Sequence, residues 1–238
     1  MSPWPWPRSA ERVRLAALAA APEGPLRDYL AHPFPAPATS VEELPLLAVD
    51  LETTGLDPAH DEVLSLGLVP VDGLRVRLSG ARRLVVRGER EVGRSATVHG
   101  ITDDAVAAGV PLADALAVLL GSLSGRVLLA HHAPLERGFL AAACRRVHGR
   151  DLPVVAVDTL ALEERALRGR GDLLAGHAWG HDEARASVRL AAARDRRGLP
   201  RYASHEALTD ALGCAELYLA QVAALREGGR TVTLRDLT

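Results

Sequence analysis

Residues 44–55 read LPLLAVDLETTG, and this stretch decides the fold prediction. Its nearly continuous apolar run is typical of a central strand that is buried on both faces. Asp50 and Glu52 stand two residues apart at the end of the run, so both side chains project from one face of the strand. Carboxylates are costly to bury unless they are used, and a pair at a strand end can bind hard divalent cations, which prefer oxygen ligands.

The segments that follow alternate between strand and helix patterns. Residues 62–73 and 74–86 predict two more strands at hairpin spacing, separated by the turn signal Asp72-Gly73. Beyond them we expect, in order, a helix over 111–125, a strand over 126–131, a helix over 134–149, a strand over 152–159, and helices over 159–169 and 206–226. This order predicts an α/β fold, a mixed five-stranded sheet flanked by helices, similar to the ribonuclease H fold.

The two ends of the chain read differently from the middle. Residues 1–44 predict an N-terminal arm with a short amphipathic helix near 9–21 between two Pro-rich segments. Trp4 and Trp6 are expected to anchor this arm by packing, with partner binding as the alternative. Residues 45–226 form the main domain, and residues 227–238 are a tail that contains either a short strand or an ordered coil.

Composition limits the class of protein. The chain has 238 residues, 48% of them apolar, which suits one large α/β domain with an extension. A formal net charge of −2 gives no basic signature for nucleic acid, but a carboxylate cluster changes its charge when it binds cations. Two cysteines in apolar helical patterns favour a reduced, cytoplasmic protein. No uncharged apolar run approaches the length of a membrane span, and the N-terminal segment is not expected to be a signal peptide.

Three residues further along carry the remaining chemistry. Glu136 falls in the first turn of the helix over 134–149 and, taken alone, would be an ordinary acid that complements the helix dipole. His205 and Asp210 straddle the start of the last helix. If that helix begins just after His205, Asp210 lies in its second turn and both side chains can face one cavity.

Together these segments resemble the DEDDh 3′→5′ exonucleases, the family of the proofreading epsilon subunit of bacterial DNA polymerase III, ribonuclease T and oligoribonuclease. Residues 49–57 match the first motif, residues 99–102 match the His-Gly-Ile-Thr segment, and His205 with Asp210 matches the His-x4-Asp motif. The second motif departs from the family pattern Ala-His-Asn-Ala-x-Phe-Asp, because residues 130–136 read AHHAPLE and Glu136 stands in place of Asp.

The resemblance implies a site that binds two Mg²⁺ or Mn²⁺ ions. Asp50, Glu52 and Asp210 would hold one ion, Asp50 would share the second, and Glu136 would support the second through water. His205 would take the proton from the attacking water. Thr53, through its backbone, and Leu56 would contact the terminal nucleotide, and His99 would be a further substrate contact. Leu56 could equally belong to the core, and His99 could simply cap a turn.

The function implied by the resemblance is a metal-dependent 3′→5′ exonuclease. It would act on 3′ ends of single-stranded nucleic acid, with DNA preferred, and release nucleoside monophosphates. Any proofreading is expected to act in trans with a separate DNA polymerase. The alternatives are an exoribonuclease that trims RNA and a non-catalytic module that binds nucleic acid or a polymerase.

Overall fold

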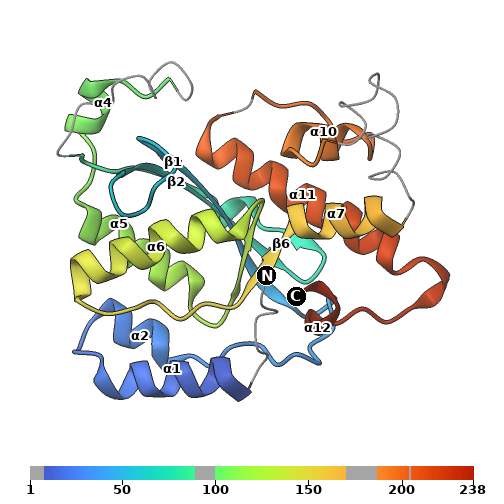
Figure 1. The fold of residues 1–238 in the computed structure, drawn as a ribbon, viewed down its shortest axis with the longest axis horizontal. Helices are drawn as coiled ribbons and strands as arrows, with labels where there is room; N and C mark the ends of the chain where they lie inside the picture. Colours follow the sequence, from blue (N-terminus) through green and yellow to red (C-terminus); the bar gives the residue numbers. More distant parts are fainter. Residues whose placement is uncertain (1–7, 89–99, 170–186, 204) are drawn as a thin grey trace.

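A computed structural model describes residues 8–88, 100–169, 187–203 and 205–238 (Figure 1). Its centre is a mixed six-stranded sheet in the order β3-β2-β1-β5-β6, with β4 also paired to β2. The strands are β1 Pro45–Thr53, β2 Val63–Asp72, β3 Arg75–Val76, β4 Arg82–Val85, β5 Val127–Ala130 and β6 Ala156–Asp158. β1 pairs antiparallel with β2 and parallel with β5, and β5 pairs parallel with β6. The mixed sheet predicted from the sequence is confirmed.

The prediction of a single strand over 74–86 is wrong. The structure divides this segment into β3 and β4, with the 3-10 turn η1 Leu78–Gly80 between them, so the sheet has six strands rather than five. Both pieces pair with β2, and the interruption faces Pro70, which has no N–H to donate to a neighbouring strand. Pro70 instead accepts a hydrogen bond from Arg77 through its carbonyl, at 2.9 Å. Gly80 fits closely here, since a Cβ on it would lie 2.9 Å from Pro70 Cγ.

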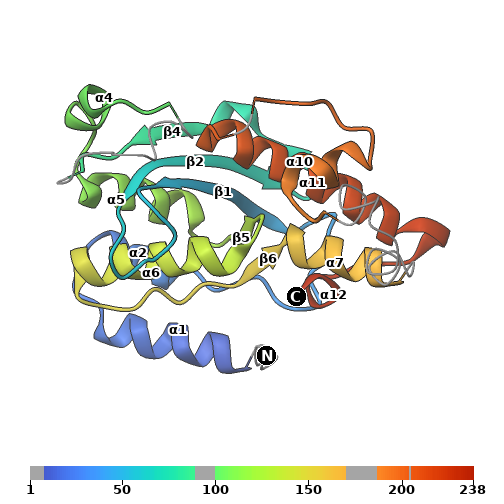
Figure 2. The same ribbon diagram turned by 45° about the horizontal axis from the view of Figure 1, so that its top comes forward.

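Helices cover both faces of the sheet (Figure 2). One face carries α1 Arg8–Ala20, α2 Pro25–Ala31, α5 Leu112–Leu123 and α6 Ala133–His148. The other carries α7 Thr159–Gly169, α11 Ala207–Leu225 and α12 Leu234–Leu237, with α10 Leu190–Asp195 packed on α11 and α4 Asp103–Ala107 at one end. Alternate residues of β1 supply the two cores: Leu47 and Val49 face α5 and α6, whereas Leu46 and Ala48 face α11. Asp50 and Glu52 follow Leu46 and Ala48 in this alternation, so their side chains lie on the face that α11 covers.

The arm and the tail are joined to each other. The amphipathic helix predicted near 9–21 is α1, and α2, which the sequence did not predict, buries Tyr29 and Leu30. The tail is ordered and ends in the short helix α12, so a strand is limited to one isolated bridge between Ser40 and Thr233. Leu234 donates its backbone N–H to the carbonyl of Thr39 at 3.0 Å, which ties the tail to the arm. Trp4 and Trp6 lie outside the described residues.

One helix in the described part of the chain, α11, is long and apolar enough to cross a membrane by length and composition alone. It lies on the sheet in Figure 1 and buries a row of residues there, including Cys214 and Tyr218, as the core helix of a globular domain does. Cys144 and Cys214 are buried and free, so they form no disulfide with each other.

Candidate metal centre

The register between β1 and β2 positions the first two carboxylates. Asp50 lies opposite Gly67, and Glu52 lies opposite Ser65. The N-terminal end of α11 lies directly on Gly67, because a Cβ at this position would be 2.0 Å from the carbonyl oxygen of Ala207. A glycine is therefore required for α11 to approach the sheet closely enough to bring its first turn, with Asp210, to the end of β1. Gly67 was not among the predicted site residues, since no local pattern in the sequence marks it.

Asp50, Glu52 and Asp210 form a compact cluster, the carboxylate trio. One oxygen from each lies within 4.8 Å of the others. Burial and the neighbouring carboxylates of Glu136 and Asp210 raise the pKa of Asp50 well above its usual value. Burial is the main reason that the pKa of Glu52 is raised to about 7, and the negative charges of Asp210 and Glu206 add to it. The positive charge of Arg83 lowers this pKa. Like charges held this closely repel one another, and a divalent cation would relieve that repulsion.

Glu136 lies beside the trio but comes from the other face of the sheet, on the first turn of α6. Its side chain is 3% exposed, and its Oε2 has no hydrogen-bond partner among the described residues. Burial, and to a lesser extent the charge of Asp158, raises the pKa of Glu136 to about 8. An acid that only complements a helix dipole can remain in water. A buried carboxyl with an unpaired oxygen, close enough to Asp50 to raise its pKa, instead fits a set of oxygen donors for hard cations.

Asp158, at the end of β6, fixes the helix that carries Glu136. Its Oδ1 accepts the backbone N–H of His132 at 2.9 Å and that of Leu160 at 3.0 Å, so it ties down the starts of α6 and α7. His132 is the N-cap of α6 and has φ 87°, in the left-handed region where Asn, Asp and His are enriched among residues other than Gly. This conformation explains how His132 can stand where the resembling family has Asn. Asp158 was not among the predicted site residues, although a carboxylate at the end of a buried strand was a signal for it.

His205 lies at the rim of the trio. It precedes α11, is exposed, has φ 66° and donates its backbone N–H to Oδ2 of Asp210 at 2.8 Å. The helix begins at Ala207, just after His205, with Glu206 as its N-cap. The expectation that Asp210 lies in the second turn is wrong, because it falls in the first turn. This early position allows the side chain of Asp210 to fold back and bond the loop that carries His205.

Two of the residues expected to contact substrate lie at the end of β1 and in the turn that follows it: Thr53 is the last residue of β1, and Leu56 lies in the turn. Leu56 is 78% exposed, so the alternative that it belongs to the core is wrong. Thr53 donates its hydroxyl to the carbonyl of Gly55 within the turn, and its own backbone lies next to Glu52. Asp61 holds the turn together by accepting hydrogen bonds from the hydroxyl of Thr54 and the backbone N–H of Asp57. His99 lies outside the part of the chain that the structure describes.

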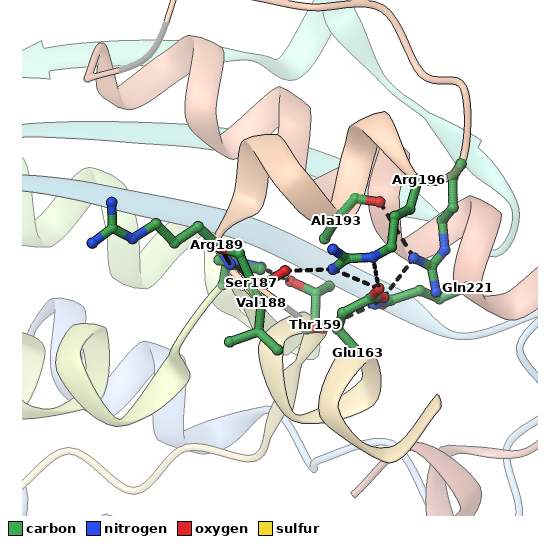
Figure 3. A network of polar contacts seen from close by, with 10 residues as sticks. Thr159, Glu163, Ser187, Val188, Arg189, Ala193, Arg196 and Gln221 are labelled. Carbon is green, nitrogen blue, oxygen red and sulfur yellow. Dashed lines mark hydrogen bonds and ion pairs between the residues drawn. The ribbon is translucent and has the colours of Figure 1, made fainter. Parts of the chain in front are cut away.

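A buried polar network supports the segment that leads to His205 (Figure 3). Glu163 on α7 is 1% exposed and pairs with Arg196, whose Nε lies 3.0 Å from Oε1, and with Arg197. Gln221 on α11 donates to the same carboxylate at 3.2 Å, and Arg196 also donates to the carbonyl of Ser187 at 2.6 Å. A buried carboxylate with this many donors is compensated. The network therefore ties residues 187–197 to α7 and α11.

Comparison with known proteins identifies the family of the chain. A family model described as exonuclease, RNase_T, matches residues 47–218. The DNA polymerase III PolC-type of Thermotoga petrophila is 29% identical over 195 residues, which are 81% of this chain and 13% of that protein. The DNA polymerase III subunit epsilon of Treponema pallidum is 27% identical over 76% of this chain and 78% of its own length. This chain thus spans only a small part of the PolC-type relative.

Solved structures share the fold. Exonuclease X in complex with 5′ overhanging duplex DNA superimposes with a TM-score of 0.55 at 21% identity, over 81% of this chain and 98% of that one. Cell-death related nuclease 4 superimposes with a TM-score of 0.63 at 13% identity, over 77% of this chain and 65% of that one. At these identities the likeness concerns the fold. Because the family model covers most of the main domain and reaches from β1 into α11, the chain belongs to the RNase_T exonuclease family.

Proposed function

We propose that this nuclease is a metal-dependent 3′→5′ exonuclease that removes nucleoside monophosphates from the 3′ ends of single-stranded DNA. The observation that carries the proposal is the carboxylate trio, with oxygens of Asp50, Glu52 and Asp210 within 4.8 Å of one another beside the buried carboxyl of Glu136. Four carboxyl groups gathered at the end of one strand are a costly arrangement for a fold to keep without cations.

The donor set suits two Mg²⁺ or Mn²⁺ ions, since every candidate ligand is a carboxylate oxygen. Asp50, Glu52 and Asp210 would hold one ion, and Asp50 and Glu136 would hold the second. Bound there, such a pair supplies a clamp for the attacking and leaving oxygens of a phosphodiester. The carboxylates then act as ligands rather than as acids and bases. Glu136 carries one methylene more than the family's Asp, and a bridging water can accommodate the added length.

His205 is assigned the role of general base. An imidazole changes charge near neutral pH, which suits it to accept a proton from water. Its backbone is fixed by the hydrogen bond to Asp210, while its side chain is exposed and accessible to an attacking water. The nearby His131 is unsuited to this role because both ring nitrogens are engaged, one with the hydroxyl of Thr159 and the other with the carbonyl of Val188.

Leu56 and the backbone of Thr53 are assigned to the terminal nucleotide. Leu56 is a large apolar side chain that stands in solvent on a turn braced by Asp61, directly after the metal-binding strand. An exposed leucine at this position can wedge against the last base and hold a frayed end. His99, which belongs to the segment that matches the family's His-Gly-Ile-Thr motif, is proposed as a further contact.

The names of the relatives support DNA as the substrate and a DNA polymerase as a partner in trans, since they are a PolC-type polymerase and an epsilon subunit. The buried free cysteines are in keeping with action in the reducing cytoplasm. RNA trimming uses the same metal site, so the two substrates have to be compared directly.

The experiment compares end-labelled single-stranded DNA and RNA of one sequence, each with Mn²⁺ or with a chelator. The parent should shorten DNA faster than RNA, and only with the metal. Asp210→Asn removes one ligand of the first ion and should lose hydrolysis while its circular dichroism spectrum stays unchanged. Faster loss of RNA would make the protein an exoribonuclease. No hydrolysis of either strand by the parent would favour a non-catalytic binding module, and full activity of Asp210→Asn would refute the metal assignment.

A further inference from the structure

The row of residues that contains Asp50 continues across the sheet to an arginine. Gly67 of β2 lies opposite Asp50 of β1 on one side and opposite Arg83 of β4 on the other. Both pairings are antiparallel, and side chains at directly opposed positions point to the same face. Arg83 therefore stands on the face that carries the trio, two strand spacings or roughly 10 Å from Asp50 along the row. Gly67 between them has no side chain, which leaves room for the first residues of α11.

Arg83 has one partner in the described part of the chain. Its Nε lies 2.9 Å from Oε1 of Glu206, and the two side chains are 43% and 32% exposed. Glu206 uses its other oxygen, Oε2, to cap α11 by accepting the backbone N–H of Thr209 at 2.8 Å. Burial and the neighbouring acids raise the pKa of Glu52, and the positive charge of Arg83 lowers it. Arg83 is thus a partly exposed cation on the face of the sheet that carries the trio.

A nucleic-acid strand that enters this site needs positive charge on the protein close to its phosphates. The chain has a net charge of −2, and the centre of the site is acidic, so phosphates beyond the metal ions are repelled unless a cation meets them. Arginine suits phosphate because its planar fork of five N–H donors matches the phosphate oxygens. The ion pair is weak, since both side chains are partly exposed and Oε1 of Glu206, although buried, accepts no hydrogen bond from Arg83. A phosphate that accepts hydrogen bonds from the guanidinium can therefore compete with Glu206.

We propose that Arg83 binds a backbone phosphate of the nucleic-acid strand and exchanges its partner Glu206 for that phosphate. The proposal rests on the proposed function in that its ligand is the nuclease substrate. The proposal predicts that two variants change the affinity for nucleic acid in opposite directions. Arg83→Gln removes the phosphate contact and should weaken binding. Glu206→Gln keeps an oxygen for the cap of α11 but frees Arg83, and should strengthen binding.

The matched control is Arg82→Gln. Arg82 is the adjacent residue on β4, is exposed, and lies opposite Leu68, so it points to the other face of the sheet. Affinity for a fluorescent oligothymidylate is measured by anisotropy across a salt series, with Mn²⁺, in the Asp210→Asn background. The same substitutions in the active protein give kcat and KM. The binding measurement needs no hydrolysis. If the parent protein had no nuclease activity, the proposed function would be refuted, but the binding measurement would still test whether Arg83 contacts a phosphate.

Arg83→Gln should raise Kd and KM at least ~5-fold with kcat nearly constant, and should make the slope of log K against log salt shallower by about 0.7. Arg82→Gln should change neither. Glu206→Gln should lower Kd, and this gain should vanish when it is combined with Arg83→Gln. The proposal is overturned if Arg83→Gln leaves the salt slope unchanged. It is also overturned if Arg83→Gln and Glu206→Gln both lower kcat alone, because the pair would then only support the helix start.

Discussion

Replacing Glu136 by Gln should raise the melting temperature of the metal-free protein at alkaline pH and leave it almost unchanged near pH 5. Burial raises the pKa of Glu136 from 4.5 to about 8. Between these two values the folded protein holds a proton that the unfolded chain has lost, so stability falls as pH rises through this window and is level above it. Gln has nearly the same shape and no charge, and it removes this loss.

The size of the effect follows from the gap between the two pKa values. One pKa unit corresponds to 1.36 kcal/mol, and a gap of about 3.5 gives an upper bound of about 5 kcal/mol. Asp50 interacts with Glu136, and its own pKa is raised mainly by burial, so its titration overlaps with that of Glu136 and we expect about 2–4 kcal/mol. For a chain of this length that is roughly 5–15 °C in melting temperature.

The assay is thermal unfolding followed by circular dichroism, with a chelator, at about pH 5 and about pH 9. Glu43→Gln, at an exposed position, is the control for loss of a carboxylate. Adding Mn²⁺ at the higher pH should raise the melting temperature of the parent more than that of Glu136→Gln, because the cation relieves the repulsion that Gln has already removed. Equal melting temperatures of parent and Glu136→Gln at about pH 9 would refute the view that Glu136 is a buried charge held for cations.

Substitutions at three positions test the site further. His205→Ala should lower kcat by ~10²-fold or more with little change in KM and should remove the acid limb of the pH–rate profile, and an unchanged profile would exclude His205 as the base. Glu136→Asp should retain measurable turnover while Glu136→Ala loses most of it, and normal turnover of the Ala variant would remove Glu136 from the metal site. Gly67→Ala should cost about 1–3 kcal/mol and reduce activity, because its Cβ would displace the carbonyl of Ala207 and with it α11; a melting temperature equal to the parent's would contradict this close approach.

Local sequence pattern predicted the elements that bury a continuous apolar face. The run over 44–52, the helix over 134–149 and the helix over 206–226 were all found within a few residues of their predicted bounds. The carboxylates of these elements could be predicted as site residues because each stands near the end of its strand or helix. The pattern failed over 74–86, where the interruption depends on Pro70 in a neighbouring strand rather than on the segment itself.

Features that depend on contacts between distant segments could not be read from the sequence. Gly67 matters only because α11, about 140 residues later, lies on it. Glu163 resembles any surface acid of an amphipathic helix until Arg196 and Arg197 fold over it. The burial of Glu136 and the row from Asp50 to Arg83 likewise require the strand order, which local periodicity does not contain.

The central claim is that the carboxylate trio and its cations remove nucleotides one at a time from a 3′ end. The most direct measurement uses one single-stranded DNA, labelled at its 5′ end, in linear and circularised forms, with Mn²⁺. The linear strand should yield a ladder of labelled products that shorten progressively, a 3′-phosphate should block it, and the circle should stay intact. Cleavage of the circle, or release of the 5′ label as a mononucleotide before shorter products accumulate, would contradict the account.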